Sequence, residues 1–158
     1  MTDDTALRAQ IAALLDWPHA HAGFDAAVKG IPPKQRSAVP AGWAYSAWQL
    51  VEHIRMAQRD ILEFCVAKTY EEKKWPDDYW PASPAPRPAT AWTAAIAAYH
   101  RDLKVLQRLA TDRGVDLTAP VPNGTGQTYL REILLVADHT AYHVGQLVAL
   151  RRQLGIWK

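Results

Sequence analysis

Apolar residues recur every three or four positions along most of the chain, and they rarely alternate with polar ones. This spacing is typical of amphipathic α-helices, whereas half-buried strands show alternation. It predicts four helical segments at residues 5–29, 46–67, 90–113 and 128–154. Because four helices that each bury one face pack into a bundle, we expect an all-α, four-helix bundle of the up-down type.

Two of these segments carry signals for where a helix begins or breaks. Ser46 and Gln49 have the spacing of a capping box, in which each side chain satisfies a free backbone N–H group at the start of a helix. Pro18 lies inside the first segment and removes a helical hydrogen bond. We therefore expect a kink there, or a new start after Asp16, which can cap a second piece.

Residues 71–89 form a long connection between the second and third helices that is rich in proline and aromatic residues. The segment holds five prolines together with Trp75, Tyr79 and Trp80. Disordered segments are poor in aromatic residues, so we expect an ordered loop that lies over the bundle. Its aromatic side chains either cover an exposed end of the core or form the wall of a pocket opening.

Composition narrows the class of protein. The 158 residues suit one domain, spanning residues 1–158, and 49% of them are hydrophobic, as in an ordinary globular protein. A net charge of +2 is too small for a typical nucleic-acid binder. The single cysteine, Cys65, excludes an internal disulfide, and we expect neither a membrane span nor a secretory signal. These features favour a cytoplasmic protein whose partner is a small molecule.

The fourth helical segment places two histidines in the middle of its apolar stripe. His139 and His143 are four residues apart, so their rings lie one turn apart on one face, in line with Leu135, Gln146 and Leu150. Burying an imidazole without a partner costs about 1–3 kcal/mol. A divalent metal compensates that cost directly, because neutral imidazole is a good ligand for zinc, nickel or iron.

A third ligand is available on the second helical segment, where His53 lies at the edge of the inward face. We therefore expect His53, His139 and His143 to form a three-histidine site with an open coordination position, as catalytic sites have. The alternative is that the histidines are core residues satisfied by protein neighbours. The stretch from His139 to His143 lacks the glutamate of H-E-x-x-H, which argues against a metalloprotease.

Three other polar residues are candidates to orient a substrate. Gln146 shares the histidine stripe and can hold the ring of a ligating histidine, and Tyr142 directly precedes His143. His21 lies on the same side of its helix as Leu14 and Phe24. From there it can reach the same cavity, as a fourth ligand or as a substrate contact. Cys65 is expected to be a small buried core group rather than a nucleophile, because no adjacent base lowers its pKa.

Three stretches of the chain carry a family resemblance: residues 45–53 (YSAWQLVEH), 75–81 (WPDDYWP) and 137–147 (ADHTAYHVGQL), the last continuing to residues 151–155 (RRQLG). Together they resemble the DinB-like (YfiT-like) metalloenzyme superfamily. The resemblance implies a four-helix bundle, commonly a homodimer. It also implies a metal held by a histidine of the second helix and a histidine pair of the fourth, which correspond to His53, His139 and His143. Members with known chemistry include thiol-dependent S-transferases and a mycothiol-dependent maleylpyruvate isomerase.

The preferred hypothesis is therefore a metal-dependent S-transferase or isomerase that uses a low-molecular-weight thiol on a small electrophile. Hydrolysis by a metal-bound water is a second hypothesis, but it lacks an evident base, since Glu52 and Asp138 point away from the histidine faces. The third is a non-catalytic module, metal-binding or related to stress, that binds a small molecule.

Overall fold

A computed structural model describes residues 4–16 and 20–157 of the chain, and the described residues are helical without a strand. Their α-helices are α1 (Thr5–Leu14), α2 (Phe24–Val28), α3 (Ala47–Val66), α4 (Ala91–Thr111) and α5 (Tyr129–Gln153). Two short 3₁₀ turns, η1 (Pro33–Gln35) and η2 (Asp77–Tyr79), lie in the connections. The predicted all-α class is confirmed.

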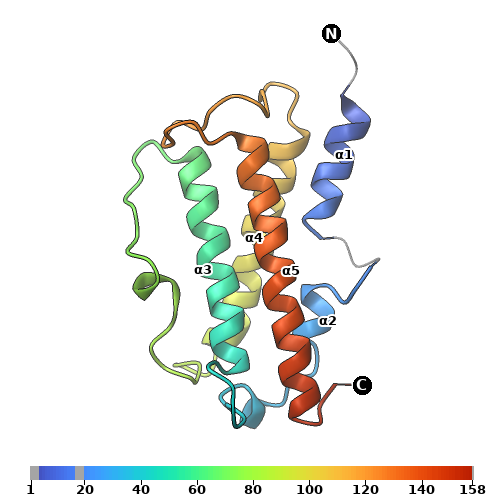
Figure 1. The fold of residues 1–158 in the computed structure, drawn as a ribbon, viewed down its shortest axis with the longest axis vertical. Coiled ribbons are helices and arrows are strands. Elements are labelled where there is room, and N and C mark those ends of the chain that lie inside the picture. The colour runs from blue at the N-terminus through green and yellow to red at the C-terminus, as the bar shows by residue number, and fades with distance from the viewer. Residues whose placement is uncertain (1–3, 17–19, 158) are drawn as a thin grey trace.

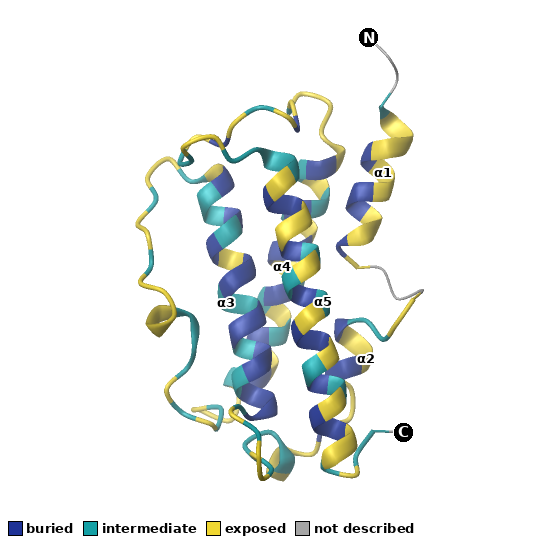
Figure 2. Cartoon of the chain, viewed as in Figure 1, coloured by how far each residue is buried: buried dark blue, intermediate teal, exposed yellow. Residues whose placement is uncertain are grey.

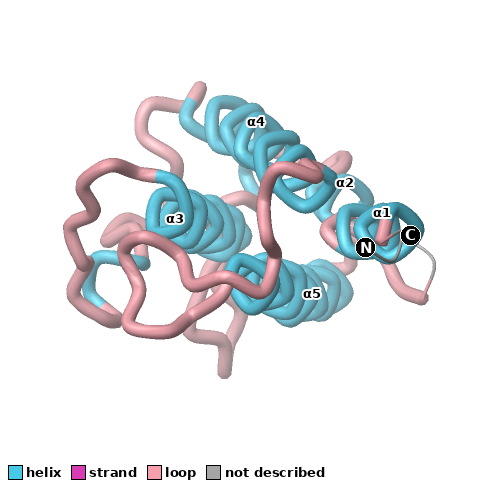
Figure 3. The backbone as a smooth tube through the Cα atoms, turned by 90° about the horizontal axis from the view of Figure 1, so that it is seen from above, coloured by secondary structure: helices cyan, strands magenta, loops and turns pink. Residues whose placement is uncertain are grey.

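The three long helices form the body of the molecule. α3 packs against both α4 and α5, while α1 packs against α4 and α2 against α5. Seen from above, α3 and α5 lie next to each other, with α1 and α2 at the side of the bundle away from α3 (Figure 3). The buried faces of the helices turn toward one another (Figure 2), and leucine and isoleucine fill much of the space between them, including Leu50, Ile54, Leu106, Ile133, Leu147 and Leu150.

The first predicted helix is divided more widely than the sequence suggests. α1 ends at Leu14, and α2 begins only at Phe24, with Gly23 rather than Asp16 as its N-cap. Phe24 is buried and stacks on Tyr99 of α4 with ring centroids 3.8 Å apart, which fixes the start of α2 against the core. Pro18, to which the sequence assigned the break, lies outside the described residues.

The expected up-down alternation is also wrong between α3 and α4. Figure 1 shows these two helices running in the same direction, with α5 returning antiparallel to both. The reason is the connection between α3 and α4, which passes back along the full length of the bundle before α4 begins (Figure 1). This crossover lays η2 and the aromatic residues around it beside α3.

The capping box at the start of α3 is confirmed, and it also holds the crossover. The Ser46 hydroxyl accepts from the Gln49 backbone N–H, and the Gln49 side-chain oxygen accepts from the Ser46 N–H, both at 3.1 Å. The same side chains then donate to the carbonyl oxygens of Pro84, at 2.7 Å, and Pro81, at 3.2 Å. The local signal for a helix start therefore also attaches the crossover to α3.

By length and composition, α5 is the one helix of the described residues that could cross a membrane, a property the sequence analysis did not anticipate. Core helices of soluble proteins have the same composition. α5 packs against α3 and α2, and Leu147 and Leu150 on its inner face are fully buried. Its apolar character therefore matches its place in the core of the bundle.

Candidate metal centre

His53, His139 and His143 come together where α3 and α5 face each other. One ring nitrogen from each lies within 4.8 Å of the others. The Nε2 atom of His53 is 3.0 Å from Nε2 of His139 and 3.1 Å from Nε2 of His143. His53 is fully buried, His143 is buried and His139 is half-buried. The structure thus brings together the three residues that the sequence selected as metal ligands.

Hydrogen bonds at the far side of two rings decide where their protons lie. The Nδ1–H group of His53 donates to the backbone carbonyl of Tyr79 at 2.7 Å, because a carbonyl can only accept. The Nδ1–H group of His143 donates in the same way to the side-chain oxygen of Gln146 at 2.8 Å, and the Gln146 amide donates to the Tyr142 hydroxyl at 3.2 Å. Both neutral rings therefore present an unprotonated Nε2 lone pair to the centre.

Two facing lone pairs repel each other unless a cation lies between them. The ligand distances of zinc, about 2.0–2.1 Å, place two nitrogens of a tetrahedral site roughly 3.3 Å apart. The separations of 3.0 and 3.1 Å between the histidine nitrogens are close to that value. The donor set, the tautomers and the spacing therefore all fit a divalent metal ion.

Burial keeps the three rings neutral, which is the form that binds metal. It lowers the pKa of His53 from 6.5 to about 4, against the opposing effect of the bond to Tyr79 and with a further lowering by His143. The pKa of His139 falls to about 3, because burial and the neighbouring His143 and His53 all disfavour its charge. Burial also lowers the pKa of His143, while its bond to Gln146 opposes the shift.

Aromatic residues of the crossover cover one side of this centre. The Trp80 ring lies parallel to the His53 ring, with centroids 3.8 Å apart, and Tyr45 stacks on Trp80 at 3.7 Å. Trp75 remains 66% exposed and, with Tyr79, lines a cavity beside His139. Of the two interpretations left open for these aromatic residues, the wall of a pocket is the one that describes Trp75 and Tyr79.

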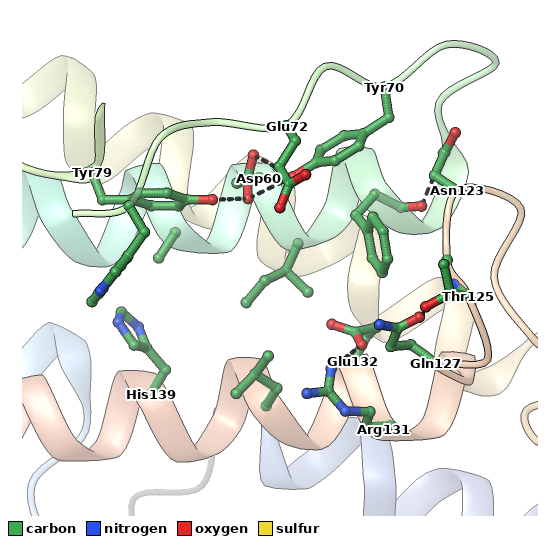
Figure 4. A pocket seen from close by; sticks show the side chains of 16 residues that line it. Asp60, Tyr70, Glu72, Tyr79, Asn123, Thr125, Gln127, Arg131, Glu132 and His139 are labelled. Atoms are coloured by element: carbon green, nitrogen blue, oxygen red, sulfur yellow. Dashed lines mark hydrogen bonds and ion pairs between the residues drawn. The ribbon is translucent and has the colours of Figure 1, made fainter. Parts of the chain in front are cut away.

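That cavity has a volume of about 710 Å³ and lies between α3, α5 and the crossover. Figure 4 shows Tyr79 and His139 at one end and polar residues at the other. The polar end includes Asn123, Thr125, Gln127, Arg131 and Glu132. Ile61, Phe64 and Leu135 give it apolar lining as well. The centre is thus open to a chamber large enough for a small organic ligand.

The remaining candidates occupy different places. Gln146 contacts the His143 ring directly, and Tyr142 is 64% exposed beside it. His21 is exposed and bonds to the Ala22 carbonyl, next to a small pocket that Thr140 and Val144 of α5 also line, so it does not join the cluster. Cys65 is fully buried, and burial raises the pKa of its thiol to about 12.

Sequence reasoning missed two kinds of contribution. The Tyr79 carbonyl is a backbone group, and the residue types in a sequence do not indicate which backbone oxygen will accept a hydrogen bond from a histidine. Asp60 and Glu132 are buried carboxylates that line the cavity. Asp60 lies seven residues after His53 and Glu132 seven residues before His139, and two turns of helix return to nearly the same face. That spacing already places Glu132 in line with the histidine stripe in the sequence, though without a role, and it is the signal that could have identified Asp60.

Comparison with known proteins gives one match. A family model described as mycothiol S-transferase matches residues 11–155, which include all three histidines and the crossover. Neither the curated proteins nor the solved structures give a match. The superfamily expected from the sequence is confirmed by this match. The chain belongs to the mycothiol S-transferase family, within the DinB/YfiT-like metalloenzyme superfamily.

Proposed function

We propose that this protein is a metal-dependent thiol S-transferase in which His53, His139 and His143 hold a divalent zinc, nickel or iron ion. The observation that carries the proposal is the convergence of Nε2 atoms, two of them fixed as lone pairs by Nδ1–H bonds, at one end of a cavity. The family description names mycothiol, a low-molecular-weight thiol, and supports a thiol of that kind as the cosubstrate.

In S-transfer the thiol loses its proton, its sulfur forms a bond to an electrophilic carbon, and the leaving group departs with its electron pair. A metal ion held by the three histidines would supply the positive charge that lowers the pKa of the thiol at neutral pH. The chain offers no nucleophile of its own at this place, because Cys65 is buried and its thiol stays protonated.

The protein residues of the site bind, orient and exclude water. Trp80 covers one face of His53, which keeps solvent from that side of the ring. Gln146, itself held by Tyr142, fixes the orientation of His143. We assign Gln146 and Tyr142 to the support of the ligands, and we do not extend the proposal to His21, which lies outside the cluster.

The length and polar lining of the cavity favour a thiol cosubstrate that is longer than cysteine. Glu132 is seven residues before His139 on α5, so the two positions are about 10 Å apart along the helix. A sulfur next to His139 leaves room for a polar tail that reaches Glu132, Gln127 and Asn123. These side chains suit hydroxyl and amide groups, whereas Phe64 and Leu135 give apolar surface for the electrophile.

The expected setting of the enzyme belongs to the same proposal. A net charge of +2 and a single cysteine support a cytoplasmic protein that binds neither nucleic acid nor membrane. The family resemblance supports a homodimer. Light scattering on the purified chain measures its mass in solution, and a mass of one chain contradicts the dimer.

Reconstitution tests the activity. The protein is stripped of metal, reloaded with zinc, nickel or iron(II), and assayed with mycothiol, bacillithiol, glutathione and cysteine against an aryl halide. We expect metal-dependent conjugation, fastest with a thiol that carries a polar tail. If no pairing exceeds the rate of the metal-free protein, the protein is not a thiol transferase.

A further inference from the structure

We infer that Asp60 is a positioning residue of the metal centre, and that it acts through Tyr79 on the ligand His53. The inference rests on the proposed metal site, and it concerns how the chain prepares one ligand before any ion binds. The hydrogen bonds of Asp60 go to residues other than the three histidines, so any effect on the metal centre must pass through an intermediate residue.

Tyr79 is that intermediate, because α3 holds it at both ends. Its backbone carbonyl accepts from the Nδ1–H group of His53 at 2.7 Å. Its hydroxyl donates to the carboxylate of Asp60 at 2.5 Å. Asp60 lies seven residues after His53 on α3, or about 10 Å along the helix axis, so the tyrosine lies along two turns of α3.

Asp60 is well suited to hold that tyrosine in place. Asp60 is only 5% exposed, and its carboxylate accepts from three side chains of the crossover. Besides Tyr79, these are Tyr70, at 3.2 and 3.3 Å, and Lys73, whose ammonium group lies at 2.6 Å. Figure 4 shows Tyr70 and Tyr79 reaching Asp60 from opposite sides. The buried charge is therefore paired and hydrogen-bonded, which makes the attachment stable.

The consequence for His53 is the choice of tautomer. A free neutral imidazole carries its proton on either nitrogen, and only the form with Nδ1–H leaves Nε2 able to bind a metal. The Tyr79 carbonyl selects that form as long as it stays 2.7 Å from Nδ1. If Tyr79 loses its attachment to Asp60, the carbonyl is no longer fixed, and part of the His53 population protonates Nε2 instead.

The test compares Asp60→Asn and Tyr79→Phe with two controls. Glu63→Gln neutralises a carboxylate on the same helix that pairs with Arg59 and, at 3.9 Å, with Lys73, but makes no bond to Tyr79. Tyr70→Phe removes a donor to Asp60 together with the contact between the Tyr70 and Tyr79 hydroxyls, and it leaves the bond from Tyr79 to Asp60 in place. The tautomer of His53 is read from its ring ¹⁵N shifts in the metal-free protein, and metal affinity is read by competition of Zn²⁺ with a chromophoric chelator.

We expect both Asp60→Asn and Tyr79→Phe to mix the His53 tautomers and to weaken Zn²⁺ binding by about tenfold or more, as loss of a support for a ligand does elsewhere. Both controls keep the wild-type tautomer and bind within about threefold of wild type. Should Asp60→Asn fail to fold, Tyr79→Phe decides alone.

The inference is overturned if these two variants lose thermal stability but keep the tautomer and the Zn²⁺ affinity of wild type, since Asp60 then only anchors the crossover. Wild-type protein that binds none of Zn²⁺, Ni²⁺ and Fe²⁺ in the same competition would end the proposed function. The tautomer shift would still report separately whether Asp60 positions His53.

Discussion

The buried guanidinium group of Arg8 and the cluster of three histidines meet their hydrogen-bonding needs in different ways. On α1, Arg8 has an acceptor for each guanidinium nitrogen: Nε donates to Asp4, Nη1 to the carbonyls of Ala110 and Asp112, and Nη2 to that of Val115. Between α3 and α5, His53 and His143 have acceptors on their outer Nδ1 nitrogens, while the Nε2 atoms of both face the centre of the cluster. The first arrangement is complete within the protein. The second leaves Nε2 lone pairs that a bound cation would satisfy, so we propose a structural role for Arg8 and a metal-binding role for the histidines.

Among changes at the histidine cluster, removing one of the three histidines should reduce metal affinity the most. His139 is half-buried, so His139→Ala leaves a small defect in packing and removes one donor from the centre. We expect metal affinity to fall by more than about 100-fold, beyond the range seen for residues that only support a ligand. Competition with a chelator measures the affinity, and circular dichroism should show unchanged helix content. Metal binding at wild-type strength would mean that His139 is not a ligand.

Loss of a ligand's support should cost less. Gln146→Ala removes the acceptor of the His143 Nδ1–H group, and we expect metal affinity to fall by about tenfold. Tyr142→Phe retains Gln146 and removes only the hydroxyl behind it, so its effect should be smaller. The same chelator competition ranks the two variants. If Tyr142→Phe binds more weakly than Gln146→Ala, the assigned order of support is wrong.

The matching change on the other side of the comparison is Arg8→Met. Methionine has an apolar side chain of similar length, but it cannot donate hydrogen bonds. The substitution therefore leaves the carbonyls at the end of α4 without their donor. We expect the free energy of unfolding to fall by about 2 kcal/mol in urea titrations. Metal affinity should not change, since Arg8 lies on α1, away from the α3 and α5 surfaces that carry the histidines. A joint loss of stability and metal binding would contradict the separation of the two regions.

Acid should weaken the metal-free protein through the histidines. Their pKa values are lowered in the fold, to about 4 for His53 and about 3 for His139, from 6.5. Below pH 6.5 the unfolded chain binds more protons than the folded one, so the free energy of unfolding falls as the pH falls toward these values. Urea unfolding in a chelator at pH 7 and pH 5 measures this loss. In the double variant His53→Asn/His139→Asn, the free energy of unfolding should differ less between pH 7 and pH 5. A difference equal to that of wild type would mean that other groups cause the pH dependence.

The parts of the structure that are periodic or local could be predicted from the sequence. The spacing of Leu50, Ile54 and Ile61 follows from one helix burying one face, and the capping box of Ser46 and Gln49 is a local exchange of hydrogen bonds. His139 and His143 were identified for the same reason, since a separation of four residues fixes their common face whatever surrounds them.

The parts that depend on distant contacts could not be predicted. The parallel course of α3 and α4 is set by the path of the crossover, for which no periodic pattern exists. The position of Trp80 on His53 joins residues 27 apart through ring stacking. Tyr79 supports His53 with a backbone oxygen, which is the same in every residue type. The sequence therefore identified the three histidines that converge, whereas the groups that support them could be found only in the structure.

The metal content of the protein tests the central claim most directly. Chain purified without a histidine tag is analysed for bound metals alongside the His53→Ala and His139→Ala variants, after each is loaded with Zn²⁺ and dialysed. The account predicts one ion per wild-type chain and almost none in either variant, with all three proteins folded. Wild-type protein without bound metal, or variants that retain it in full, would contradict the assignment of this centre.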